Sequence, residues 1–297
     1  MYHGIINVYK EKGFTSHDVV AKLRGICKQK KIGHTGTLDP DAVGVLPVCL
    51  GSATKLCDML TDKTKEYVAV LKLGVVTDTQ DLTGTILEEH PVTVTEEQIR
   101  EVIFSFQGDQ LQIPPMYSAL KYKGKKLYEY AREGKFLDLK ARKVNIKSLE
   151  LIEQIDKDLY RIKIECSSGT YIRSLIRDLA YELSSYATMQ ELIRTRSSKF
   201  DLSMAYDIDY IKSIDKYKLE DLLIPIDDAL SEMRSYEVAD FFYKGITNGR
   251  IYKADPDNSI INQDLKVYCR NEFIGIGSYV EKNDIKGIKI KKMLKGD

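Results

Sequence analysis

The residues with the clearest potential for chemistry lie in one short segment, Gly33 to Pro40. It contains two glycines, a histidine, an aspartate and a proline. Glycine adopts backbone angles that other residues avoid and proline restricts the chain, so the segment predicts a loop of fixed shape. This loop presents one carboxylate, Asp39, although a structural turn explains the same residues nearly as well when they are considered alone.

Two further candidates lie far from this loop in the sequence. The β-forming residues from Glu66 to Leu73 predict a central strand with Tyr67 at its start. Apolar residues from Ile172 to Leu183 keep helical spacing, which places Arg173 in the first turn of a helix. Because a cation at that position opposes the helix dipole, we expect Arg173 to have a partner elsewhere, such as a carboxylate.

Motifs for cofactor and metal chemistry are missing from the sequence. Without a GxxxxGKS/T or GxGxxG motif, a nucleotide cofactor has no obvious binding site. The sequence also has no serine nucleophile elbow and no cluster of metal ligands. Its five cysteines are scattered with no CxxC pair, which predicts reduced thiols in a cytoplasmic protein. We therefore expect no metal and no cofactor.

The total charge does not identify a partner, because 45 Lys and Arg residues nearly balance 44 Asp and Glu residues. The segment 116–147 differs, with ten Lys and Arg against three Asp and Glu. Four tyrosines are interleaved with these cations, a mixture that suits RNA phosphates and bases. A solvated helix whose tyrosines face the core is the alternative. No secretory signal precedes the first strand, and no apolar run of about 18 residues is present to span a membrane.

The hydropathy pattern predicts the order of the elements. Further strands are expected at 4–9, 45–50, 144–155 and 159–166, and further helices at about 16–27, 51–60 and 96–106. The N-caps of these helices are assigned to Thr15 or Ser16, to Gly51-Ser52 and to Thr95. The pair Pro114-Pro115 predicts that 108–120 lacks regular structure.

The C-terminal part changes in character. An acidic segment, 201–233, has nine Asp and Glu against three Lys and reads as a boundary region. Short β segments follow from about residue 235, at 265–269, 273–280 and 287–293. We therefore predict two domains, 1–234 and 235–297.

The loop Gly33 to Pro40 resembles the signature of the TruB family of tRNA pseudouridine synthases, and the similarity covers roughly residues 3–200. It continues through Gly44 to Pro47 and Gly51 to Lys55. Three more matching blocks follow in the family's order, namely Lys65 to Tyr67, Pro115 to Arg132 and Gly169 to Arg173.

The resemblance implies an α+β fold with a mixed, largely antiparallel central sheet flanked by helices. It also implies an RNA-clasping insertion at about 116–143 and a small, β-rich, PUA-like RNA-binding domain at the C-terminus. The implied reaction needs no cofactor and isomerises uridine-55 in the T-loop of tRNA. The N1 glycosidic bond breaks, the base rotates, and C5 rejoins the ribose. The expected partner is the T-arm of tRNA, and we expect a monomer without a protein partner.

The same resemblance assigns the site. Asp39 is the catalytic carboxylate, and Arg173 is its partner, since an adjacent guanidinium favours an ionised carboxylate. Tyr67 stacks on the target base, and its hydroxyl helps to remove the C5 proton. His34 fills the space that the flipped base vacates.

Other positions are assigned to substrate binding by resemblance. Tyr171 and Leu192 line the uridine pocket, although core packing explains Leu192 equally well. Lys55 contacts a phosphate or simply ends a helix. Ser168 stands where family members carry a lysine, so one interaction with a phosphate is expected to be missing. The lysines of the clasp that are expected to contact RNA are Lys121, Lys125 and Lys126.

Two alternatives compete with this hypothesis. A non-catalytic tRNA-binding or tRNA-folding module would keep the basic surface without needing Asp39, Tyr67 and Arg173 together. A guide-RNA-dependent relative is the second, and the lack of long basic tails favours a stand-alone bacterial enzyme over it.

Overall fold

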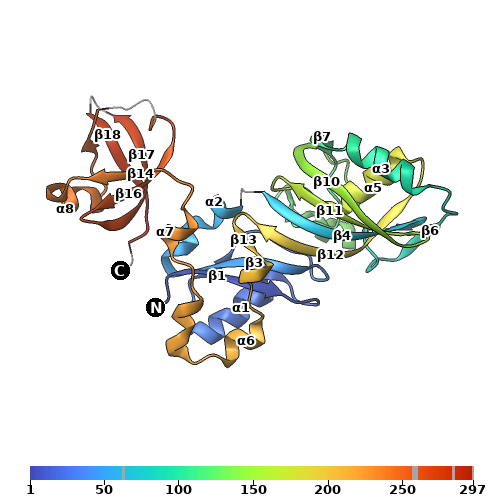
Figure 1. Ribbon diagram of the computed structural model, residues 1–297, viewed down its shortest axis with the longest axis horizontal. Coiled ribbons are helices and arrows are strands. Elements are labelled where there is room, and N and C mark those ends of the chain that lie inside the picture. The colour runs from blue at the N-terminus through green and yellow to red at the C-terminus, as the bar shows by residue number, and fades with distance from the viewer. Residues whose placement is uncertain (62–63, 256–259, 283–284, 296–297) are drawn as a thin grey trace.

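The structure is a computed structural model that describes residues 1–61, 64–255, 260–282 and 285–295. The protein contains a nine-stranded sheet and a separate five-stranded sheet (Figure 1). The large sheet has the order β1-β3-β12-β4-β11-β10-β7, with β2 paired to β3 and β13 to β12. Its strands are β1 (Gly4–Lys10), β2 (Ile32–His34), β3 (Val43–Leu50), β4 (Lys65–Leu73), β7 (Gly108–Gln112), β10 (Arg142–Asp156), β11 (Leu159–Cys166), β12 (Ala187–Ser197) and β13 (Phe200–Asp201).

The pairing of the large sheet is mixed and mainly antiparallel, which confirms the predicted fold class. Strands β12 and β3 run parallel, whereas β1–β3, β12–β4, β4–β11, β11–β10 and β10–β7 are antiparallel. The strand predicted to be central, β4, lies between β12 and β11. Tyr67 is therefore near the start of a strand that has neighbours on both sides.

Helices cover the sheet through two hydrophobic clusters. Helices α1 (Ser16–Cys27) and α6 (Ile208–Ser213) pack on β1 and β3. Helices α3 (Glu96–Ser105) and α5 (Ile172–Glu182) pack on β4, β10, β11 and β12. The first turn of α5 thus lies at the edge of the second cluster. None of the helices in the described ranges is long and apolar enough to cross a membrane.

Helix α1 begins as its sequence predicts. Thr15 is the N-cap, its hydroxyl accepts from the Asp18 amide at 3.1 Å, and the Asp18 carboxylate accepts from the Thr15 amide at 2.8 Å. This reciprocal capping box satisfies two amides that the helix itself leaves unpaired. Thr95 and Gln98 form the same motif at the start of α3. Both caps are confirmed.

Two local predictions are wrong in part. The helix predicted at 51–60 is present as a 3-10 helix, η1 (Gly51–Leu56), followed by α2 (Cys57–Thr61). The predicted cap is wrong, since no side chain caps η1 and the Ser52 hydroxyl bonds His3. Residues 108–112, predicted to be irregular, form the strand β7. Because β7 is the last strand of the sheet beside β10 in the part of the chain that the structure describes, its polar side chains are tolerated.

Strand β12 was not predicted from the sequence. Its residues 187–197 include Gln, Glu, Thr and two Arg, so no alternation of apolar residues marks it. In the structure it lies between β3 and β4 and carries both Leu192 and Arg194. Pairing on both sides, which depends on distant parts of the chain, makes this polar stretch a strand.

The C-terminal part forms the five-stranded sheet, with the order β14-β16-β17-β18-β15 (Figure 1). Its three predicted β segments correspond to β16, β17 and β18. A separate core beneath the sheet contains Val238, Ile246 and Leu265. The strands are β14 (Ser235–Val238), β15 (Tyr252–Lys253), β16 (Asp264–Cys269), β17 (Glu272–Lys282) and β18 (Ile285–Met293).

The capping box predicts a measurable contribution to stability. Replacing Thr15→Ala removes the hydroxyl that accepts from the Asp18 amide, and should lower the free energy of unfolding by about 1 kcal/mol. Urea unfolding followed by circular dichroism measures the change. Thr93→Ala, at an exposed position before α3, is the control. Equal effects of the two substitutions would contradict the capping account.

Candidate active site

The loop Gly33–Pro40 runs from β2 toward β3 and is fixed by backbone contacts. The Thr35 amide and hydroxyl both donate to the Pro47 carbonyl, at 3.1 and 3.2 Å. The Ser16 hydroxyl of α1 accepts from the Leu38 amide at 2.9 Å. Gly36 has φ +112, a conformation that L side chains rarely adopt. The loop therefore has the fixed shape that its sequence predicts.

Lys10 supports the loop from inside the protein. Its side chain is buried, and its Nζ donates to the carbonyls of Glu11, Phe14 and Pro40 at 3.0, 2.6 and 2.9 Å. Burial lowers the pKa of Lys10 to about 8, while the nearby Asp41 and Asp39 oppose that shift. The three carbonyls supply the partners that a buried ammonium needs. Sequence reasoning missed Lys10, since a lysine ending a strand gives no sign of burial.

Asp39 contacts Arg173, as the sequence predicted. Arg173 Nη2 lies 2.9 Å from Asp39 Oδ2. The arginine side chain is 5% exposed and the aspartate side chain is 43% exposed. A buried guanidinium thus holds a carboxylate that remains open to solvent. The partner expected for a cation in the first turn of α5 is confirmed.

Arg173 also contacts a second carboxylate, Asp81, which the sequence analysis did not identify. Nη1 lies 3.4 Å from Asp81 Oδ2 and donates to the Thr79 carbonyl at 2.8 Å. Nη2 donates to the Tyr117 carbonyl at 2.9 Å. Asp81 Oδ1 in turn accepts from the Thr83 amide at 3.1 Å. These contacts from several directions determine the position of the guanidinium.

Asp81 lies in the turn between β5 (Val75–Thr77) and β6 (Ile86–Glu89). The only signal in the sequence is the polar run of residues 77–81, which follows the apolar strand β4 closely. Such a run is typical of any loop and does not mark Asp81 as a site residue. Only its contact with Arg173 in the structure does so. Strand pairing and helix packing bring the turn to the start of α5.

Tyr67 forms the buried part of the site. It lies in the same hydrophobic cluster as Leu38, which precedes Asp39, and as Leu192. Burial is the main reason that the pKa of Tyr67 rises to about 12. Arg194 is its cross-strand partner on β12, and Leu192 pairs with Ala69 further along the same two strands. The structure thus brings Asp39, Arg173, Tyr67 and Leu192 together from four segments.

Tyr171 immediately precedes α5 and is held by Gln112 of β7. The Gln112 side chain accepts from the Tyr171 amide at 2.8 Å and donates to the Tyr171 carbonyl at 3.1 Å. Burial raises the pKa of Tyr171, and Asp39 adds to that rise. The side chain therefore lies within electrostatic range of the loop carboxylate.

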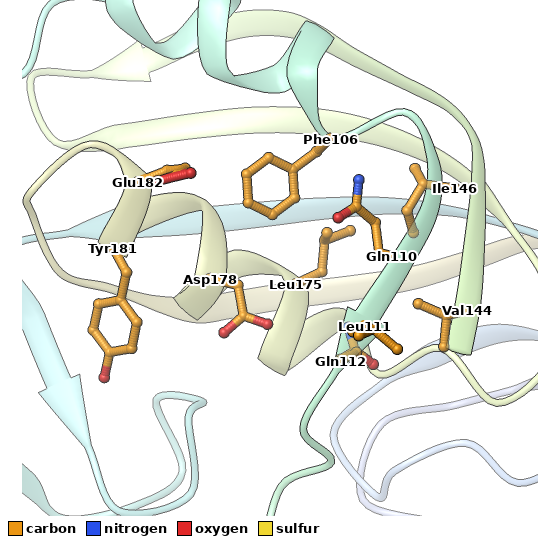
Figure 2. A pocket seen from close by; sticks show the side chains of 10 residues that line it. All are labelled: Phe106, Gln110, Leu111, Gln112, Val144, Ile146, Leu175, Asp178, Tyr181 and Glu182. Carbon is orange, nitrogen blue, oxygen red and sulfur yellow. The ribbon is translucent and has the colours of Figure 1, made fainter. Parts of the chain in front are cut away.

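A separate groove of about 280 Å³ lies between β7 and α5. Figure 2 shows Gln110 on β7 and Leu175 and Asp178 on α5 among the side chains that line it. Its lining residues include none of the predicted site residues. The groove is connected to the site through Gln112, which forms one wall and fixes Tyr171 on the other side.

Family models and curated proteins match this chain over most of its length. The model of the TruB family pseudouridylate synthase (N terminal domain) matches residues 24–172, and that of the tRNA pseudouridylate synthase B C-terminal domain matches 173–231. The tRNA pseudouridine synthase B of Alkaliphilus oremlandii is 44% identical over 98% of both chains. That of Clostridium tetani is 41% identical over 98% of this chain and 99% of its own. This chain belongs to the TruB family. It is therefore a pseudouridine synthase, an isomerase.

Solved structures share this TruB-family fold over nearly the whole chain. A chain in the crystal structure of a Cbf5–Nop10–Gar1 complex aligns with a TM-score of 0.74 at 26% identity, covering 99% of this chain and 85% of that one. A chain of an H/ACA RNP bound to a substrate RNA containing 2'-deoxyuridine aligns with a TM-score of 0.71 at 25% identity, covering 98% and 85%. The five-stranded C-terminal sheet is included in this coverage.

Lys55, which the TruB resemblance assigned to a phosphate or a helix end, contacts the C-terminal sheet. Its Nζ donates to the Met293 carbonyl of β18 at 2.6 Å, and Lys292 Nζ donates to the Lys55 carbonyl at 2.7 Å. In this structure the residue therefore joins η1 to the C-terminal sheet.

The segment 116–143, which the resemblance predicts to be an RNA-clasping insertion, contains a small hairpin and a helix outside the main sheet. These elements are β8 (Lys121–Tyr122), β9 (Lys125–Lys126) and α4 (Leu127–Arg132). Lys125 lies 4.8 Å from the centre of the Tyr130 ring and pairs with Glu133, and Lys126 lies 5.4 Å from the Tyr128 ring. Lys121 is exposed. The tyrosines thus pack against neighbouring cations on a partly exposed surface, and not in the core.

His34 of this TruB loop is half-buried. The His34 and His17 rings make a T-shaped contact, with ring centres 5.5 Å apart and planes at 73°. The Nδ1 of His34 has no hydrogen-bond partner within the described residues. Burial is the first cause that lowers the pKa of His34 below 6.5, and the neighbouring His17 and Arg194 lower it further.

The environment of His34 predicts its titration. We expect a midpoint below 6.5 in NMR spectra of the RNA-free protein, because burial disfavours the imidazolium. Since the folded-state pKa is below the unfolded value, this histidine's contribution to stability is present above about pH 6.5 and is lost as the pH falls. His17→Asn removes a group that becomes positive, and should move the midpoint of His34 upward. A midpoint at or above 6.5 in the unsubstituted protein would contradict this account.

Proposed function

We propose that this protein converts uridine-55 in the T-loop of tRNA to pseudouridine, with Asp39 as the catalytic carboxylate. The observation that carries the proposal is the contact between the open carboxylate of Asp39 and the buried guanidinium of Arg173. The substrate is supported by relatives that are named tRNA pseudouridine synthase B and match almost the full chain.

The first step breaks the bond between N1 of uracil and C1′ of the ribose. Positive character develops at C1′, and the carboxylate of Asp39 attacks or stabilises it, or takes a proton from C2′. Its side chain is 43% exposed, which leaves it accessible to a ribose that enters from solvent. Arg173 keeps the carboxylate in place, and Asp81 holds Arg173 from the other side.

The later steps use the apolar side of the site. The target base leaves the T-loop stack and lies against the Tyr67 ring, with Leu192 and Tyr171 beside it. The base then rotates, and C5 joins C1′. Tyr67 helps to remove the C5 proton through its hydroxyl group in the deprotonated form, while His34 fills the space that the base left in the RNA. The hydrophobic cluster of Tyr67 with Leu38 and Leu192 supports this arrangement, because a stacked base needs apolar surroundings.

The RNA-binding surface extends beyond the site. The clasp carries Lys121, Lys125 and Lys126, and the proposed C-terminal domain, 235–297, adds a second RNA-binding surface to the catalytic domain, 1–234. Lys55 lies at their junction, which is consistent with binding a phosphate or with a purely structural role. Five free cysteines support a reducing, cytoplasmic setting.

A non-catalytic tRNA-binding or folding module is the competing function. It has no need for an open carboxylate that is fixed by a buried arginine next to a buried tyrosine. The similar structures of RNP complexes contain protein partners, whereas the curated relatives carry the tRNA enzyme's name. We propose a stand-alone enzyme that acts as a monomer.

The role of Asp39 is tested by Asp39→Asn. Tritium release from a tRNA transcript labelled at uridine C5 should fall by ~10⁴-fold or more, because the reactive carboxylate is absent. Binding of the tRNA, measured by filter retention, should persist. The matched control is Asp41→Asn, an exposed aspartate two residues further along, which should retain near-normal turnover.

Wild-type turnover in the Asp39→Asn protein would exclude the proposed mechanism. Tritium release from an isolated T-arm stem-loop, measured beside full tRNA, defines the smallest substrate. Release from neither RNA by the unsubstituted protein would support the non-catalytic module instead.

The clasp is tested by the double substitution Lys125→Ala and Lys126→Ala. It should weaken tRNA binding. It should also make the slope of log affinity against log salt concentration less negative, by about 0.7 to 0.9 for each phosphate that a lysine no longer neutralises. Lys212→Ala with Lys218→Ala, at exposed positions in the acidic segment, is the control. Unchanged affinity of the clasp variant at all salt concentrations would remove these lysines from the RNA interface.

A further inference from the structure

Arg194 is a buried cation for which the sequence analysis assigned no role. Its side chain is 0% exposed, and it is the first among the largest fully buried side chains of the described chain. It forms no salt bridge with a carboxylate within the described residues. Removing a charge from water without an opposite charge costs stability, so its position requires an explanation.

The backbone contacts of Arg194 account for only part of its hydrogen-bonding capacity. Nε donates to the Val45 carbonyl of β3 at 2.7 Å, and Nη2 donates to the Gly36 carbonyl of the loop at 3.4 Å. Nη1 has no hydrogen-bond acceptor within the described residues. The guanidinium therefore connects β12 to the loop and still has donor capacity left.

Tyr67 is the group that Arg194 faces. The two residues are directly opposite each other on the antiparallel strands β4 and β12, so their side chains lie on the same face of the sheet. Burial raises the pKa of Tyr67 to about 12, and Arg194 is the next cause and lowers it. Cys166 of β11 and Asp39 of the loop raise it. Arg194 thus favours the phenolate against the rest of the surroundings.

We propose that Arg194 is a positioning residue that holds the Tyr67 hydroxyl and stabilises its phenolate when it accepts the C5 proton. This inference rests on the proposed function, in which C5 becomes bonded to both C1′ and hydrogen after the base has rotated. The C5–H bond then breaks, and its electron pair forms the C5–C6 double bond. The electron pair of the N1–C6 double bond moves to N1, which takes up a proton from water. The phenolate oxygen of Tyr67, whose own proton has passed to solvent, accepts the proton from C5. A neighbouring cation lowers the energy of the phenolate that this step requires.

The competing explanation is structural. Arg194 would only brace β3 and the loop through Val45 and Gly36, and its proximity to Tyr67 would be incidental. Because the loop carries Asp39, that role predicts that substitution of Arg194 slows every step of the reaction equally. The proposed role predicts that only the last step becomes slower.

The test compares Arg194→Gln with the unsubstituted enzyme on T-arm RNA that carries protium or deuterium at uridine C5. Because the last step slows, kcat should fall by about 10²-fold, KM should change little, and the isotope effect on kcat should increase. The rate should also continue to rise at alkaline pH where the unsubstituted enzyme levels off, since less phenolate forms. Arg194→Lys keeps the charge and should recover part of kcat and of the normal isotope effect.

A second substrate isolates the earlier steps. Fluorine at C5 cannot leave as a cation, so RNA with 5-fluorouridine reports bond cleavage and rotation without the final deprotonation. Arg194→Gln should convert this RNA at the rate of the unsubstituted enzyme. The matched control is Arg196→Gln, on the same strand, whose side chain pairs with Glu66 and Glu165 instead. It should leave kcat and the isotope effect unchanged.

Two results would overturn the inference. One is a loss of kcat with an unchanged isotope effect and an equal loss on 5-fluorouridine RNA, which identifies a brace. The other is a normal kcat in Arg194→Gln. If Arg194→Gln does not fold, the Arg194→Lys variant provides the test. An isotope effect in Arg194→Lys that is identical to that of the unsubstituted enzyme contradicts the proposal. If the unsubstituted enzyme does not release C5 tritium, the proposed function itself is refuted. That result differs from the two results above, which overturn only the role of Arg194.

Discussion

The guanidinium of Arg173 is the group on which the arrangement of the site depends. It contacts Asp39 of the loop, Asp81 and the Thr79 carbonyl of the β5–β6 turn, and the Tyr117 carbonyl at the start of the clasp. A planar fork with several donors can satisfy acceptors from three directions, which an ammonium cannot do with the same geometry. The arginine therefore fixes three segments of the chain around the start of α5.

Two further buried cations hold the same loop from the inside. Lys10 binds the Pro40 carbonyl, and Arg194 binds the Gly36 carbonyl, so the loop is fixed on either side of Asp39. The loop backbone turns its carbonyls toward these buried charges, while the Asp39 side chain remains open to solvent. A carboxylate held in this way needs little reorganisation when charge develops beside it.

On the surface of the segment 116–143, the cations are exposed or partly exposed and not buried. In the clasp, lysines lie over tyrosine rings and are partly exposed, so they remain available to a polyanion. The similar RNP structures share the fold across nearly the whole chain at 25–26% identity. A shared fold by itself therefore does not identify a partner for this chain.

Much of the architecture was evident in the sequence because local rules govern it. Thr15 and Thr95 predict their helices through capping boxes, and the β-forming run to Leu73 predicts the central strand. The cation in the first turn of α5 predicts a distant carboxylate, and Asp39 is in contact with it. Family resemblance, and not spacing, supplied the roles of Tyr67, His34 and the clasp.

The remainder depends on which segments meet, and no local pattern encodes that. The polar residues of β12 become a central strand only between β3 and β4, and those of β7 become an edge strand only beside β10. Asp81 is an ordinary loop aspartate until the fold places it beside Arg173. Lys10 and Arg194 look like surface cations in the sequence, and the fold buries them because backbone carbonyls compensate their charge. Residue types and local spacing thus predicted a loop of fixed shape with one carboxylate and a cation that needs a distant partner. Family resemblance paired Asp39 with Arg173, and long-range packing determined the groups that hold them.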